Sequence, residues 1–171
     1  MSFDLTACGK PLTLCAMREH SLSRSPLTDH NFFDLNWLTS EIEYEGFPLL
    51  LRKPNHVAIE RLKPRFTKLV TIEHFLEKVT KNGLPEKSYN KSLADFDHRM
   101  CTLIDSDKEG IIVLIETFCG KRNYYYYTRS DFDISQYLEE VKIGFKVSLK
   151  ITVKKDSDWK FMKQYPVNLY S

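Results

Sequence analysis

The sequence lacks most of the short patterns that mark a catalytic, nucleotide-binding or metal-binding site. Only six of its 171 residues are glycine, and none has the spacing of a phosphate-binding loop. The four cysteines never form a Cys-x-x-Cys pair, and no two of the five histidines share a helix face at i, i+4 spacing. We therefore expect no cofactor and no resident metal, and we predict that the protein is not an enzyme.

A long apolar run is also missing. No segment approaches the roughly 18–20 residues that span a bilayer, and the start of the chain has neither the basic residues nor the apolar core of a signal peptide. A net charge of +2 is too small to indicate nucleic acid or membrane binding by itself. We expect a cytoplasmic protein that contacts no membrane, with its cysteines reduced and structural.

Two neighbouring segments stand out against this background. Residues from Ile111 to Ile115 are all apolar, and Tyr124 to Tyr127 are four consecutive tyrosines. They are predicted to form antiparallel strands joined at Gly120-Lys121. Because side chains alternate between the faces of a strand, the tyrosines divide into two pairs. One pair should be buried opposite Ile111, Val113 and Ile115, and the other should lie on the surface.

Hydrophobic periodicity predicts the remaining elements. The first predicted element is a hairpin that turns at Glu45-Gly46. The last is the tail around Trp159, which forms a turn or short helix and folds back on the domain, and Asp156 and Asp158 are expected to cap that turn. The other predicted elements are hairpin strands over Ile42 to Arg52, a strand over Phe66 to Glu77, a helix from Pro85 with Leu93 and Phe96 in its apolar stripe, a helix over Ile134 to Val141, and a strand over Phe145 to Val153.

From Phe66 onward this order is strand, helix, strand, strand, helix, strand, which is typical of the ferredoxin-like split βαβ fold. We predict an α+β two-layer sandwich, in which an antiparallel sheet carries two helices on one face. The N-terminal β-hairpin would extend the sheet or cover its edge. Residues 1–31 form a variable N-terminal extension, and residues 32–171 form the single domain.

Several short motifs occur in the order found in a known family. They are Asn36-Trp37 with Glu43 to Arg52, Asn82-Gly-Leu-Pro85, Tyr126-Tyr-Thr128 and Asp156-Ser-Asp-Trp159. Over residues 36–165 the chain thereby resembles a bacterial family known as domain of unknown function 695. That family is distantly similar to the regulator of ribonuclease E activity B, a protein-binding inhibitor with a ferredoxin-like layout. The resemblance implies a non-catalytic regulatory role, although this chain is net basic where an acidic inhibitor is expected.

We therefore expect a module that binds another protein. RNA binding is the alternative, because RNA-recognition modules share this element order and stack bases on strand aromatics. However, the glycines of their signature are absent, and the first strand carries Glu73. A small hydrolase or other enzyme is a further alternative, since cations beside Cys119 would lower its pKa, but the sequence places no histidine base near it.

The candidate binding surface follows from the aromatic strand and its flanking cations. The sequence does not determine an oligomeric state. The predicted surface residues are Lys121, Arg122, Tyr124, Tyr125, Tyr126, Tyr127 and Arg129.

Overall fold

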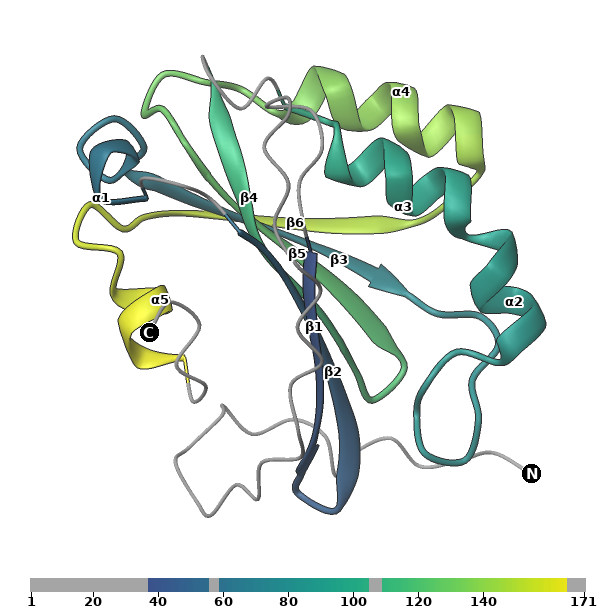
Figure 1. Cartoon of the computed structure of the whole chain (residues 1–171). Helices are drawn as coiled ribbons and strands as arrows, with labels where there is room; N and C mark the ends of the chain where they lie inside the picture. The colour runs from purple at the N-terminus through teal and green to yellow at the C-terminus, as the bar shows by residue number, and fades with distance from the viewer. Residues whose placement is uncertain (1–36, 56–58, 105–108, 166–171) are drawn as a thin grey trace, which may run out of the picture.

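The computed structural model describes residues 37–55, 59–104 and 109–165 (Figure 1). The predicted extension over residues 1–31, and the domain boundary after it, lie outside the described residues. The described part has a six-stranded antiparallel sheet in the order β1-β2-β4-β5-β3-β6, together with five helices. The predicted α+β class and antiparallel sheet are confirmed. Among the described helices, none is both long and apolar enough to cross a bilayer.

The elements have the following bounds. The strands are β1 Trp37–Tyr44, β2 Phe47–Pro54, β3 Lys68–Phe75, β4 Gly110–Phe118, β5 Lys121–Thr128 and β6 Leu149–Lys155. The helices are α1 Ile59–Leu62, α2 Lys87–Ser92, α3 Ala94–Cys101, α4 Ser135–Phe145 and α5 Lys160–Gln164.

Both hairpins turn through a residue of positive φ followed by glycine. The φ angles are 50° and 79° at Glu45 and Gly46, and 45° and 76° at Cys119 and Gly120. Positive φ at both central residues is the pattern of the type I′ turn, whose twist matches that of the flanking strands. The predicted turn at Glu45-Gly46 is confirmed. The prediction for the second hairpin is one residue too late, because Lys121 already pairs with Phe118.

Strand β4 contains a β-bulge between Ile112 and Leu114. Ile112 and Ile115 contribute to one apolar core, whereas Ile111, Val113 and Leu114 contribute to the core on the opposite face. The extra residue places Val113 and Leu114 on the same face, as a bulge does. The prediction that Ile115 shares a face with Ile111 and Val113 is therefore wrong.

The sheet carries an apolar core on each face. One core joins residues of α3 and α4 to alternate residues of β3 and β5, including Tyr124 and Tyr126. The other joins residues around α5 to the β1–β2 hairpin and to Tyr125 and Tyr127. Figure 1 shows α3 and α4 lying together, with α5 well away from them.

Two helix boundaries differ from the prediction. The helix expected from Pro85 begins at Lys87 and is divided at Leu93 into α2 and α3. Pro85 instead forms an isolated bridge with Val79. The predicted core positions Leu93 and Phe96 are nevertheless buried. The last strand begins at Leu149 rather than Phe145, because Phe145 completes α4, which ends where Lys146 adopts left-handed backbone.

Gly83, in the Asn-Gly-Leu-Pro segment, supports the β4–β5 turn. Its φ is +75°, and a Cβ there would lie 2.9 Å from the Cα of Cys119. The close approach allows the amide of Gly120 to donate to the carbonyl of Gly83 at 2.8 Å. Only glycine meets both requirements, so this segment and the hairpin turn fit each other as a unit.

The C-terminal tail folds back as predicted. Asp156 accepts hydrogen bonds from the backbone amides of Lys160 and Phe161, at 2.8 and 3.0 Å, and thereby caps α5. The indole N–H of the fully buried Trp159 donates to the carbonyl of Phe66 at 2.7 Å. These bonds fix α5 against the sheet face opposite α3 and α4.

Candidate functional site

All four tyrosines of β5 are buried. Tyr124, Tyr126 and Tyr127 are at most 1% exposed, and Tyr125 is 9% exposed. The prediction that one pair lies on the surface is therefore wrong. The face that helices α3 and α4 leave uncovered is occupied at these positions by the aromatic residues around α5.

Tyr125 and Tyr127 stack on aromatic rings of the C-terminal tail. Their ring centroids lie 4.5 Å from Phe161 and 3.9 Å from Trp159, with interplanar angles of 27° and 6°. The hydroxyl of Tyr127 also donates to Asp156 at 2.5 Å. The stacking surface that an RNA base would need is thus already filled by the chain itself.

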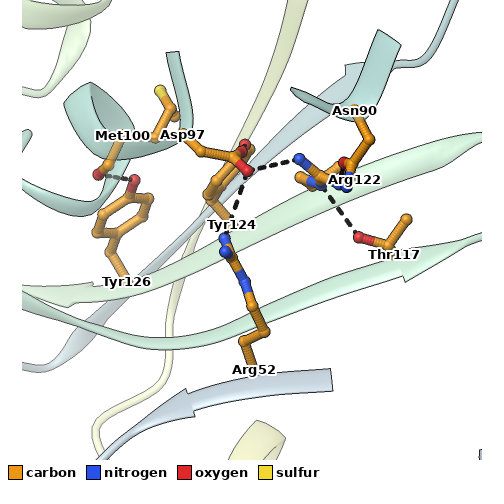
Figure 2. Close-up of polar contacts among 8 residues, drawn as sticks. All are labelled: Arg52, Asn90, Asp97, Met100, Thr117, Arg122, Tyr124 and Tyr126. Atoms are coloured by element: carbon orange, nitrogen blue, oxygen red, sulfur yellow. Dashed lines mark hydrogen bonds and ion pairs between the residues drawn. The ribbon is translucent and has the colours of Figure 1, made fainter. Parts of the chain in front are cut away.

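Arg122 is the centre of a polar cluster between the sheet and helices α2 and α3 (Figure 2). Its three donor nitrogens are directed at three elements: Nη1 lies 2.6 Å from Asp97, Nη2 lies 2.7 Å from Asn90, and Nε lies 3.1 Å from Thr117. The arginine was predicted to be a surface residue but is 5% exposed. Its contacts indicate that it holds both helices on the sheet.

Asp97 collects several donors at this place. The Tyr124 hydroxyl donates to one carboxylate oxygen, and Arg122 donates to the other. Arg52 approaches the second oxygen at 3.6 Å, beyond hydrogen-bond distance. Burial raises the pKa of Tyr124 well above its ordinary value, and Asp97 adds to the rise. Burial lowers the pKa of Arg122, but Asp97 and Tyr124 together outweigh it, so the pKa is raised and the guanidinium stays charged.

This arrangement does not provide the parts of an acid–base site. A general base needs a free acceptor near a reacting group, whereas the Asp97 carboxylate already accepts from Tyr124 and Arg122. Within the described ranges, no group of three His, Cys, Asp or Glu side chains is placed to hold a metal ion. The cluster is better explained as an anchor for the helices.

The cysteines offer no activated nucleophile in the described part of the chain. Cys119 is disulfide-bonded, so it carries no free thiol. The prediction of a reduced thiol is therefore wrong at this position. The hypothesis that neighbouring cations activate Cys119 as a nucleophile is wrong for the same reason. Cys101 is a free cysteine, and burial raises the pKa of its thiol to about 11. It remains protonated at neutral pH and is a poor nucleophile.

Of the predicted surface residues, only Lys121 and Arg129 reach solvent. Arg129 is exposed and forms an ion pair with Asp131 at 2.7 Å, immediately after β5. Lys121 lies at the other end of the strand, with its ammonium 5.1 Å from the ring centroid of Phe75. The two cations therefore do not form one surface.

Lys121 belongs instead to a surface that spans three strands. We name this surface the open face: it is the accessible part of the sheet that points away from α3 and α4. Strand register places on it Thr71, Glu73 and Phe75 of β3, Lys121 and Asn123 of β5, and Lys150, Thr152 and Lys154 of β6.

The open face combines positive charge with an exposed aromatic ring. Glu73 lies 2.9 Å from Lys150 and 3.3 Å from Lys121. Burial raises the pKa of Glu73, but the two lysines outweigh it, so its pKa is lowered. Phe75 is 48% exposed beside this ion pair. With three lysines against one glutamate, the open face is suited to an acidic partner that also offers apolar surface.

Sequence reasoning identified only Lys121 of this surface. Glu73, Phe75 and Lys150 come from strands that are far apart in sequence, and register alone brings them together. Two features of the sequence could have indicated this surface. Lysines alternate with apolar residues along the last strand, and the split βαβ order places that strand beside β3.

Comparison with known proteins identifies a family. A family model described as "Family of unknown function (DUF695)" matches residues 36–166, which include all the motifs noted in the sequence. No curated protein and no solved structure gives a significant match. The similarity to the regulator of ribonuclease E activity B stays a prediction. Because the matching model spans most of the chain, the protein belongs to the DUF695 family.

Proposed function

We propose that this protein is a non-catalytic regulatory module that binds another protein through its open face. The observation that carries the proposal is Phe75, a large apolar side chain left 48% exposed next to Lys121. Aromatic side chains are enriched where proteins bind each other. The surrounding lysines favour a partner that is acidic around an apolar contact.

The proposal includes the ferredoxin-like layout. The strand order β4-β5-β3-β6 supports the layout, since it places the first and third strands of a split βαβ unit in the middle. The β1–β2 hairpin would then extend this unit through the pairing of β2 with β4. The cytoplasmic location stays a prediction, and the disulfide at Cys119 counts against it, because disulfides are rare in the cytosol.

A protein partner is favoured over RNA for two reasons. The tyrosines that would stack bases are covered by Trp159 and Phe161. In addition, Glu73 pairs with Lys121 and Lys150, so the open face is not the uninterrupted basic surface typical of phosphate-backbone binding.

The proposal is tested by partner capture with matched variants. Tagged wild-type protein, Phe75→Ala and Lys121→Glu are incubated with native lysate from the source cells, and captured proteins are identified. Phe47→Ala is the control for the aromatic change, because Phe47 is 37% exposed at the β1–β2 turn. Lys87→Glu, on the exposed start of α2, is the control for the charge change.

We expect a partner that the wild type and both controls retain and that both open-face variants lose. Circular dichroism should show an unchanged fold in every variant. Retention of the partner by Phe75→Ala would contradict the proposal. Salt-sensitive binding of labelled polyuridine, lost in Lys121→Glu and with no protein captured, would replace it with RNA binding.

A further inference from the structure

Strand β6 lies at one edge of the described sheet. It pairs with β3 without interruption, from Leu149 opposite His74 to Lys155 opposite Lys68. The strand contains neither proline nor a bulge, two features with which proteins commonly protect such an edge. Its backbone is therefore regular enough to accept a further strand.

The side chains of β6 differ between its two faces. Lys150, Thr152 and Lys154 belong to the open face. On the other face, Ile151 packs against the α3–α4 core, and Val153 is 49% exposed. A strand added beside β6 would therefore meet cations on one face and apolar side chains on the other.

We propose that β6 binds an extended segment of the partner protein as an added strand, and that this segment alternates acidic and apolar side chains. The inference rests on the proposed function, because Lys150 and Lys154 are part of the open face. Backbone hydrogen bonds would supply affinity, and the alternating side chains would supply specificity, as in other cases of strand addition. Acidic residues of the segment would lie beside the lysines, and apolar residues would lie beside Val153.

Lysines on an edge strand also discourage pairing between copies of the same chain. That role and the proposed one predict different responses to an acidic strand. Lysines that only repel other copies attract any acidic segment by charge alone, so the scrambled and alternating peptides should then bind equally, whereas strand recognition requires that the alternating peptide bind more tightly.

The test uses synthetic peptides and the full-length protein. The probe is an end-blocked peptide as long as β6 that alternates glutamate and valine. Three peptides serve as controls: a scrambled order, a lysine–valine alternation, and the probe N-methylated at alternate residues, which removes one row of amide donors. Affinity is measured by titration calorimetry, and amide exchange of β6 is followed by NMR with and without peptide.

We expect the probe to bind and to protect the β6 amides that do not bond to β3. Changing both Lys150 and Lys154 to glutamate should weaken binding by about tenfold or more, as should N-methylation of the row facing β6. The charge-matched control, Lys142→Glu on α4 combined with Lys87→Glu on α2, should change nothing.

Three outcomes would overturn the inference: equal binding of the scrambled peptide, unchanged affinity after the lysine changes, or β6 amides already protected by self-association. The proposed function would survive them if Phe75→Ala still abolished partner capture. Conversely, the peptide could bind as expected while Phe75→Ala retains the partner. That result would contradict partner binding through Phe75 and would still support strand addition at β6.

Discussion

The two faces of β5 bury their tyrosines by different means. Under α3, Tyr124 donates to Asp97 and Tyr126 donates to the carbonyl of Met100 at 2.7 Å, so each ring is held through its hydroxyl. On the opposite face, Tyr125 and Tyr127 are held mainly through their rings, which stack on Phe161 and Trp159. One strand thus joins a polar anchor on one side to an aromatic stack on the other.

The difference shows why an aromatic strand need not be a ligand surface. Without the tail, the rings of Tyr125 and Tyr127 would have formed an open aromatic platform. Asp156 prevents this, because it caps α5 and also accepts from Tyr127. The exposed surface therefore lies farther along the sheet, toward β3 and β6, beyond the part of the tail that the structure describes.

The aromatic stack should be the more sensitive of the two attachments. Trp159→Ala removes a fully buried indole, its stacking on Tyr127 and its hydrogen bond to Phe66. We expect a loss of about 3–5 kcal/mol in the free energy of unfolding, which is typical of large aromatic truncations. Urea titration followed by circular dichroism measures it. A loss as small as that of a surface change would show that α5 contributes little to the fold.

The polar anchor should be next in size. Asp97→Ala leaves Arg122 buried without its counter-charge, and we expect a loss of about 2–4 kcal/mol, somewhat below a fully buried pair because Asp97 is partly accessible. The double variant Asp97→Leu with Arg122→Met should recover part of this loss in the same urea titration. If the double variant is no more stable than Asp97→Ala, the cost does not come from an uncompensated charge.

The α3 face should also respond to pH. His74 is 2% exposed, and burial together with the neighbouring Arg122 lowers its pKa from the ordinary 6.5. The folded protein then binds fewer protons than the unfolded one, so stability is complete above the ordinary pKa and falls as the pH drops from there toward the folded pKa.

The charged groups around His74 also include Asp97 and Glu77, which act in the opposite direction. Urea midpoints measured on both sides of pH 6.5 should show a smaller loss than the two substitutions above. His74→Gln should flatten this dependence. Glu73 and Asp156 have lowered pKa values, so their contribution disappears only in more acidic solution, and the two effects can be separated.

The open face should be almost neutral for stability. Glu73→Gln removes both ion pairs of the face, but its lysine partners are largely solvated. We expect a change of less than about 1 kcal/mol, as for other accessible ion pairs. Partner capture should become tighter because the face becomes more positive. A large loss of stability would place Glu73 in the fold rather than in recognition.

The sequence was informative where local patterning decides the structure. The alternation around Glu45-Gly46 predicted the first hairpin, and the stripe through Leu93 and Phe96 predicted which residues the helices bury. It also predicted that the tail around Trp159 folds back. These features depend on spacing within one element, which can be read directly from the chain.

The site was less predictable because it depends on how distant strands meet. Burial of Arg122 requires Asn90 on α2 and Asp97 on α3 as hydrogen-bond partners, and no local sequence pattern links these residues to Arg122. The sequence likewise treated Phe145 as part of a strand, although it packs on Phe96 at the end of α4. Over such a short stretch, alternating apolar residues fit either a strand or a helix end, and tertiary contacts determine which of the two forms.

The bulge at Val113 determines how a deletion in β4 would affect the side of the sheet that each residue faces. Odd-numbered residues up to the bulge face the same side of the sheet as even-numbered residues after it. Deleting Val113 would leave the remaining residues on their present faces, whereas straightening the strand with Val113 retained would force either Ile111 and Ile112 or the residues from Leu114 onward to exchange faces. The bulge, which absorbs one extra residue, is therefore what keeps Glu116 directed toward Tyr165 and Thr117 toward Arg122.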